Sequence, residues 1–84
     1  MKLSKFSNNH IKLEFNTGVI MLQSYDSPVA IYDGIGCTYL NSSIYHYSRT
    51  TAKHVNKFLT TVYGDSVEVS RDRFNELMQE LCHD

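Results

Sequence analysis

The sequence predicts an α+β fold in two layers, an antiparallel β-meander of about four strands followed by two helices packed on one face of the sheet. Two observations support this prediction. Over residues 11–47, apolar residues alternate with polar ones or form short runs bounded by turn residues. From residue 48 onward, apolar residues instead recur every three or four positions, the period of an amphipathic helix. We expect the 84 residues to form a single domain.

The first hairpin is expected over residues 11–25. Ile11, Leu13 and Phe15 alternate with polar residues, which is typical of a strand with one face in solvent. The turn Asn16-Thr17-Gly18 follows, in which glycine can take a positive φ. The next strand opens with four apolar residues, 19–22, and is therefore expected to be central and covered on both faces. Residues 1–10 are polar and are expected to precede the first strand.

Two more strands are expected before the helices. Residues 26–28 include a proline and predict a turn, and residues 29–32 predict the third strand. Asp33 and Gly34 indicate a hairpin into a fourth strand, 35–40, with Ile35, Cys37 and Tyr39 on one face. Residues 44–47 then cross towards the helices, with a short fifth strand as the alternative.

The helices are expected over residues 48–63 and 70–82. The hydroxyl residues at 48, 50 and 51 suit a helix start, and Ala52, Val55 and Phe58 begin one apolar face. Gly64 is expected to end this helix in the left-handed conformation. Ser70 is expected to cap the second helix, whose apolar stripe includes Phe74 and Leu77.

Composition excludes several classes of function. A formal net charge of −1 gives no global field that would draw the chain to nucleic acid or membranes. The longest aliphatic run, residues 19–22, is far shorter than a membrane helix, so we expect no membrane partner. Two widely separated cysteines, Cys37 and Cys82, behind a start too polar for a signal peptide, predict a cytoplasmic protein.

Catalytic, metal and cofactor signatures are also missing from the sequence. There is no Cys-x-x-Cys or His-x3–5-His pair for zinc, and no glycine-rich loop for phosphate or dinucleotide. Ser48 with His46 or His54 lacks an orienting carboxylate and an oxyanion loop nearby. We therefore expect a protein that is not an enzyme and that holds no metal and no cofactor.

One segment carries a family resemblance. Tyr47-Ser-Arg-Thr-Thr-Ala-Lys-His54, followed by Asn56-Lys-Phe-Leu59, resembles a motif in small uncharacterised proteins of tailed phages and prophages, grouped as a domain of unknown function. The resemblance spans residues 11–63 and implies a phage origin and a β-meander that leads into a helix. It implies no activity.

The same segment is the candidate binding site. Two tyrosines could anchor a protein partner, and Arg49 could donate directionally. A helix start surrounded by cations also suits phosphate or carboxylate. The plainer interpretation is a helix cap beside a solvated basic face. The candidate residues are Tyr45, Tyr47, Ser48, Arg49, Thr50, Lys53, His54 and Lys57.

Three functions remain open from the sequence. The first is a small non-enzymatic phage accessory protein that binds a host or phage protein in the host cytoplasm, with inhibition of a bacterial defence system as one role. The alternative is binding of nucleic acid, or of a nucleotide through its phosphate, at the start of the first helix. The third is homodimerisation through a sheet edge or the second helix.

Overall fold

The computed structural model describes residues 2–7, 10–24, 27–45, 49–62 and 64–82. Its strands and helices follow one another along the chain as β1 (Lys2–Ser7), β2 (His10–Glu14), β3 (Ile20–Ser24), β4 (Ser27–Tyr32), β5 (Cys37–Asn41), α1 (Ser42–Tyr45), α2 (Arg49–Leu59), β6 (Asp65–Val69) and α3 (Arg71–Leu81).

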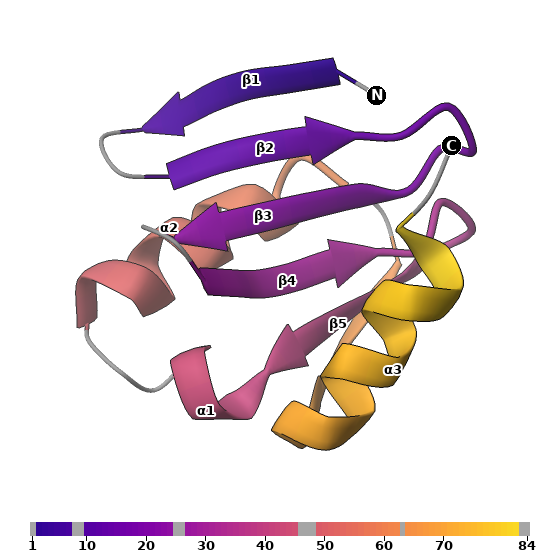
Figure 1. Ribbon diagram of the computed structural model, residues 1–84. Helices are drawn as coiled ribbons and strands as arrows, with labels where there is room; N and C mark the ends of the chain where they lie inside the picture. The colour runs from indigo at the N-terminus through magenta and orange to yellow at the C-terminus, as the bar shows by residue number, and fades with distance from the viewer. Residues whose placement is uncertain (1, 8–9, 25–26, 46–48, 63, 83–84) are drawn as a thin grey trace.

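The described strands form one six-stranded sheet, in which the order of the strands is their order in the sequence. Neighbours from β1 to β5 are antiparallel, and β6 lies parallel to β5 at one edge. A parallel neighbour cannot be reached through a tight turn, so the chain needs a crossover. The segment with α1 and α2 is that crossover, and Figure 1 shows α2 behind the sheet.

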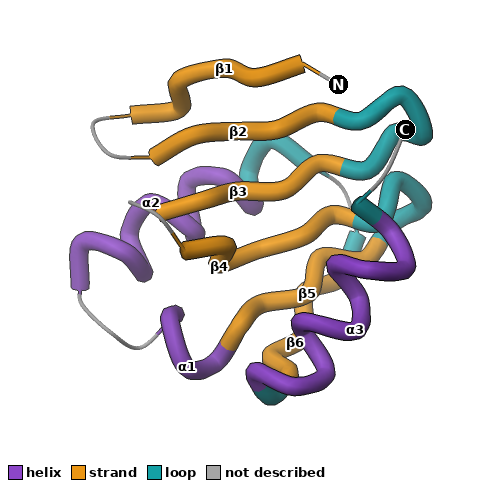
Figure 2. The backbone as a smooth tube through the Cα atoms, in the orientation of Figure 1, coloured by secondary structure: helices purple, strands orange, loops and turns teal. Residues whose placement is uncertain are grey.

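The helices α2 and α3 cover opposite faces of the sheet. After β6 the chain returns as α3 across the front face in Figure 1, and Figure 2 shows this helix beside β5 and β6. The central strand β3 shows that both faces are covered. Its neighbouring residues Met21 and Leu22 point to opposite sides of the sheet, and both are buried. The molecule therefore has three layers, with the sheet in the middle.

Each helix closes a core of its own. The first, which we call the α2 core, joins buried residues of the sheet such as Leu22 and Leu40 to Val55 and Phe58 of α2. The second, the α3 core, joins Leu13, Met21 and Ile31 to Phe74 and Leu77 of α3. Phe58 and Phe74 are both 0% exposed, so each helix packs against the sheet through one fully buried aromatic ring.

The α+β class is confirmed, but two details of the predicted architecture are not. The sheet has six strands instead of about four, and the helices do not share one face. The two additional strands are β1 and β6. β1 falls within the polar first ten residues, and β6 is exposed along most of its length. Neither strand has the strong apolar pattern by which a strand is recognised in a sequence. The crossover places α2 on one face of the sheet before β6 is added. The helix that follows β6, α3, packs against the other face.

The first hairpin forms as predicted. Phe15 N donates to Val19 O at 2.9 Å and Gly18 N to Phe15 O at 3.1 Å, while Gly18 has φ +94°. This is the pattern of a three-residue hairpin loop that ends in a left-handed residue. The following strand, β3, is central and covered on both faces, also as predicted.

The turn after β4 differs from the predicted two-residue hairpin. β5 begins at Cys37, and Ile35 lies in the turn with 89% of its surface exposed, so Ile35 does not share a strand face with Tyr39. Asp33 Oδ1 accepts from the N–H groups of Ile35, Gly36 and Cys37 at 2.8, 3.0 and 3.1 Å. Partial burial acts to raise the pKa of Asp33, but these three donors outweigh it and hold the pKa below its ordinary value.

The short helix α1, Ser42–Tyr45, follows β5 directly, at a place where a crossing strand was the alternative. Asn41 Oδ1 accepts from Ser43 N at 3.1 Å and from Ser43 Oγ at 2.7 Å, which caps the first turn of α1. Tyr45 ends α1, and residues 46–48 lie outside the described part of the chain.

The ends of the two longer helices follow from their polar residues. α2 ends at Leu59 rather than 63, because Thr60 and Thr61 donate through N–H and Oγ1 to the carbonyls of Lys57 and Phe58. Gly64 has the expected positive φ, but it introduces β6 instead of capping α2. Ser70 caps α3 as predicted, accepting from Arg73 N at 3.3 Å.

Candidate functional site

Helix α2 has one buried and one exposed side. Val55 and Phe58 are fully buried in the α2 core, whereas Lys53, Asn56 and Lys57 are exposed. No acidic residue occurs between Arg49 and Leu59. The exposed side is therefore a basic surface, which we call the α2 basic face and define by Lys53, Asn56 and Lys57.

The structure places only part of the predicted site. Tyr47 and Ser48 lie outside the described residues, and Tyr45, Arg49 and Thr50 are described in their backbone alone, at the end of α1 and the start of α2. Lys53 and Lys57 are one helical turn apart on the α2 basic face. His54 is half-buried and lies against the sheet, so it belongs to a different environment from the two lysines.

His54 contacts His10 of β2. His54 Nδ1 lies 2.9 Å from His10 Nδ1 and 3.1 Å from His10 Nε2, and the rings meet edge to face with centroids 4.0 Å apart. His10 is only 1% exposed. This pair is not evident from the sequence, because His10 shares a strand face with Lys12 and Glu14, and such a polar face is expected to point to solvent. That side of β2 is instead the side that α2 covers.

The close pair disfavours the charged form of His54. Burial lowers the pKa of His54, and the proximity of His10, Lys53 and Lys57 lowers it further. With its nitrogen so close to another imidazole and near two lysines, His54 takes up a proton less readily than a free imidazole does. We therefore expect the α2–sheet contact to weaken as the pH falls below neutrality.

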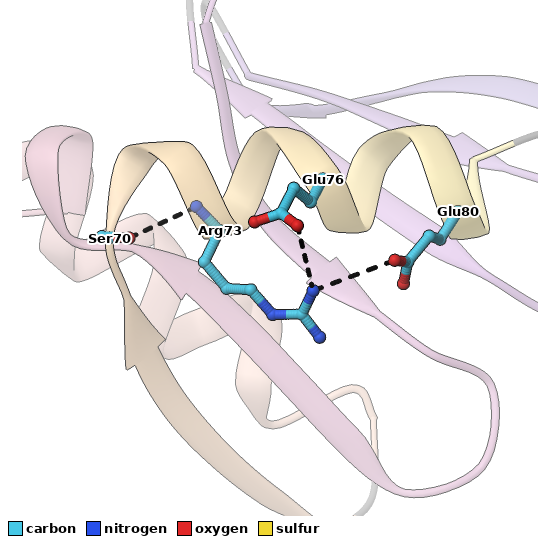
Figure 3. A network of polar contacts seen from close by, with 4 residues as sticks. All are labelled: Ser70, Arg73, Glu76 and Glu80. Carbon is cyan, nitrogen blue, oxygen red and sulfur yellow. Dashed lines mark hydrogen bonds and ion pairs between the residues drawn. The ribbon is translucent and has the colours of Figure 1, made fainter.

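Helix α3, on the opposite face of the sheet, carries acidic side chains. Asp72, Glu76 and Glu80 are exposed on α3. Arg73 Nη1 lies 3.9 Å from Glu76 Oε2 and 3.9 Å from Glu80 Oε1, and Figure 3 shows it between the two carboxylates. The cations of α2 and the acids of α3 are thus separated by the sheet, although the net charge is close to zero.

Comparison with known proteins identifies the family. A family model described as a family of unknown function, DUF8033, matches residues 1–76. The chain belongs to the DUF8033 family. No curated protein and no solved structure matches it. The DUF8033 match runs from β1 into α3, so it includes both His10 and His54 and the whole of α2.

The described residues contain no group of three or more His, Cys, Asp or Glu side chains placed to hold a metal ion. Among the described helices, none combines the length and the apolar character needed to cross a bilayer. A phage origin remains a prediction from the motif that begins at Tyr47.

Replacing His54 should reduce the acid sensitivity of this DUF8033 protein. Because the pKa of His54 is lowered in the folded state, the unfolded chain gains a proton first as pH falls below about 6.5. The wild type should therefore lose more unfolding free energy than His54→Gln between about pH 7.5 and about pH 5.5. Urea unfolding at both pH values measures this difference. An NMR titration that puts the pKa of His54 at or above about 6.5 would contradict the explanation.

Proposed function

We propose that this DUF8033 protein is a small non-enzymatic accessory protein of phage type that binds a host or phage protein in the bacterial cytoplasm. The proposed contact surface is the α2 basic face together with Arg49 and the two tyrosines that precede it in the sequence, Tyr45 and Tyr47. Inhibition of a bacterial defence system is the process that we would test first.

The observation that carries the proposal is the division of α2 into two sides. Its apolar side packs in the α2 core, and its other side carries the exposed residues Lys53, Asn56 and Lys57, two of which are basic. A stable fold needs the first side only, because exposed lysines contribute little to stability. Arginine and tyrosine, which the adjoining segment provides, are enriched among the residues that dominate protein interfaces.

Reversing a charge on the α2 basic face should release the partner. Lys53→Glu is expected to lower the amount of partner captured from a host lysate by about tenfold, because like charges facing each other across an interface cost more than 1.4 kcal/mol. Capture with the tagged chain, followed by quantitative mass spectrometry, measures the ratio for each protein. Lys57→Glu should act in the same direction.

The matched control is Arg73→Glu, which makes the same change in net charge on α3, the helix on the opposite face of the sheet. The surface ion pairs that this change removes, between Arg73 and the two glutamates of α3, contribute little to stability. Proteins retained by Arg73→Glu and lost by Lys53→Glu are partners of the α2 basic face. If every captured protein stayed bound to Lys53→Glu and to Lys57→Glu, the surface would be wrongly assigned.

Binding of nucleic acid, or of a nucleotide phosphate, is the second candidate, supported by the separation of charges across the sheet. The acids of α3 do not lie on the face that carries Lys53 and Lys57, so a local positive field can persist on a chain of net charge −1. The same variants test it by fluorescence anisotropy with labelled single-stranded DNA and RNA. Affinity should fall about tenfold between about 50 and about 200 mM salt, because displaced counterions set the slope. A flat salt response would remove this candidate.

A further inference from the structure

A cavity lies away from the α2 basic face, where the beginning of α3 meets the ends of the sheet strands. Its volume is about 300 Å³. The lining includes Ser27 of β4, Asn41 at the end of β5, Ser43 of α1, and Arg71, Asn75 and Met78 of α3. Four separate elements thus converge on one small space, whose lining is both polar and apolar.

The α3 wall presents two hydrogen-bond donors. Arg71 and Asn75 are four residues apart on one helix, so their side chains lie on the same side. Within the described part of the chain, neither side chain forms an ion pair or a hydrogen bond. Arg73, two positions along, is in contrast placed between Glu76 and Glu80 (Figure 3). Arg71 is therefore the cation of α3 whose charge is not already balanced by a neighbouring carboxylate.

The opposite wall adds a buried amide. Asn41 is 5% exposed, and its Oδ1 accepts both hydrogen bonds from Ser43. Its Nδ2 has two N–H groups but reaches only Pro28 O, at 3.5 Å, the limit of a hydrogen bond. The two hydrogen bonds from Ser43 fix the orientation of the Asn41 amide. The Nδ2 group can therefore donate a further hydrogen bond to a ligand. A buried donor so weakly engaged is costly unless a further acceptor reaches it.

The hydrogen-bonding groups of the cavity favour a ligand with a carboxylate. A guanidinium with amide N–H groups on both walls is a donor set, and a carboxylate is an acceptor-only group whose two oxygens fit the arginine fork. Met78 and Pro28 supply an apolar portion of the lining. The volume is at the lower end of ligand sites and suits a ligand of about one or two amino-acid residues. Asp72, next to Arg71 in the sequence, is exposed and does not line the cavity.

We propose that this cavity binds a carboxylate carried on a small apolar group, with Arg71 as the principal ligand-binding residue and Asn75 and Asn41 as further donors. The carboxylate comes either from a free small molecule or from the C-terminus of a peptide. Such a site is independent of the α2 basic face, because it is built from other elements.

The test uses the full chain, labelled with ¹⁵N, and three probes. N-acetyl-leucine carries the carboxylate, N-acetyl-leucine amide is its neutral counterpart, and N-acetyl-Gly-Gly-Leu presents the same carboxylate at the end of a peptide. The two carboxylates should produce saturable shifts in the amide signals of Ser43, Arg71 and Asn75, and the neutral amide should not. Tighter binding of the tripeptide would identify a peptide C-terminus as the ligand, and equal binding a free small carboxylate.

Arg71→Gln should weaken carboxylate binding at least about tenfold, because it removes a charge-assisted hydrogen bond. Arg73→Gln is the matched control, since it removes the same charge from the same helix outside the cavity, and it should bind like the wild type. Asn75→Ala should weaken binding less than Arg71→Gln and provides a second variant at an exposed position. Equal binding of the acid and the amide, or equal effects of Arg71→Gln and Arg73→Gln, would overturn the proposal. Absence of saturable shifts with both carboxylates would overturn it as well.

Discussion

Replacing Gly64 by alanine is expected to destabilise the protein by about 2 to 5 kcal/mol, the sum of backbone strain and a steric overlap. Gly64 has φ +91°, and a Cβ there would lie 1.8 Å from the carbonyl oxygen of Gly36 and 2.5 Å from its carbonyl carbon. The obstacle is backbone, so no side-chain rotation relieves it. Moving the chain apart would break the hydrogen bond from Asp65 N to Gly36 O, 3.0 Å, at the point where β6 joins β5.

The control for Gly64→Ala is Gly18→Ala. Gly18 has almost the same φ, +94°, but a Cβ there would meet nothing closer than 4.0 Å. This variant should therefore show the strain alone, about 1 to 2 kcal/mol. Urea unfolding of both variants gives the two free energies. Equal losses would mean that the close approach of Gly64 to Gly36 does not contribute.

Truncating either buried phenylalanine should cost about 3 to 5 kcal/mol, because Phe58→Ala and Phe74→Ala each leave a large cavity under a helix. Each ring is 0% exposed, Phe58 in the α2 core and Phe74 in the α3 core. Thermal or urea unfolding measures both losses. Ile35→Ala, at the 89% exposed turn position, is the control and should change the unfolding free energy by less than about 0.5 kcal/mol.

The three-layer arrangement adds a sharper expectation for these two sites. Because the sheet separates the rings and they belong to different cores, the milder pair Phe58→Leu and Phe74→Leu should give free-energy losses that add within about 0.5 kcal/mol. Two rings packed against each other on one face would instead show a coupling larger than this. A strongly non-additive double variant would therefore contradict the placement of the helices.

Residues that act locally were predicted well. The turn ending in Gly18 and the cap at Ser70 depend on hydrogen bonds within a few residues, and the sequence predicted both. The apolar positions of both helices were also predicted, since Phe58 and Phe74 follow the helical period. What periodicity cannot express is the face of the sheet against which a helix packs, because a stripe of apolar residues fits either face equally.

In the candidate site, too, local features could be predicted from the sequence and tertiary contacts could not. The exposure of Lys53 and Lys57 follows from their positions opposite Val55 and Phe58 on one helix. The contact of His54 with His10 depends instead on which strand α2 crosses, a tertiary feature. The cavity at Arg71 likewise depends on tertiary structure, because it joins α3 to residues of β4, β5 and α1 that lie about thirty or more positions earlier in the sequence, so no local motif marks it.

The parallel pairing of β5 with β6 also bears on the order in which the chain can assemble. The strands from β1 to β5 each pair with the next strand along the chain, whereas the register that joins Cys37 to Asp65 closes a loop containing both α1 and α2. Closing such a loop costs chain entropy before its contacts are gained, so pairing of this kind is formed late. The antiparallel strands can therefore collapse first and act as the template on which the crossover, the last strand and α3 are added.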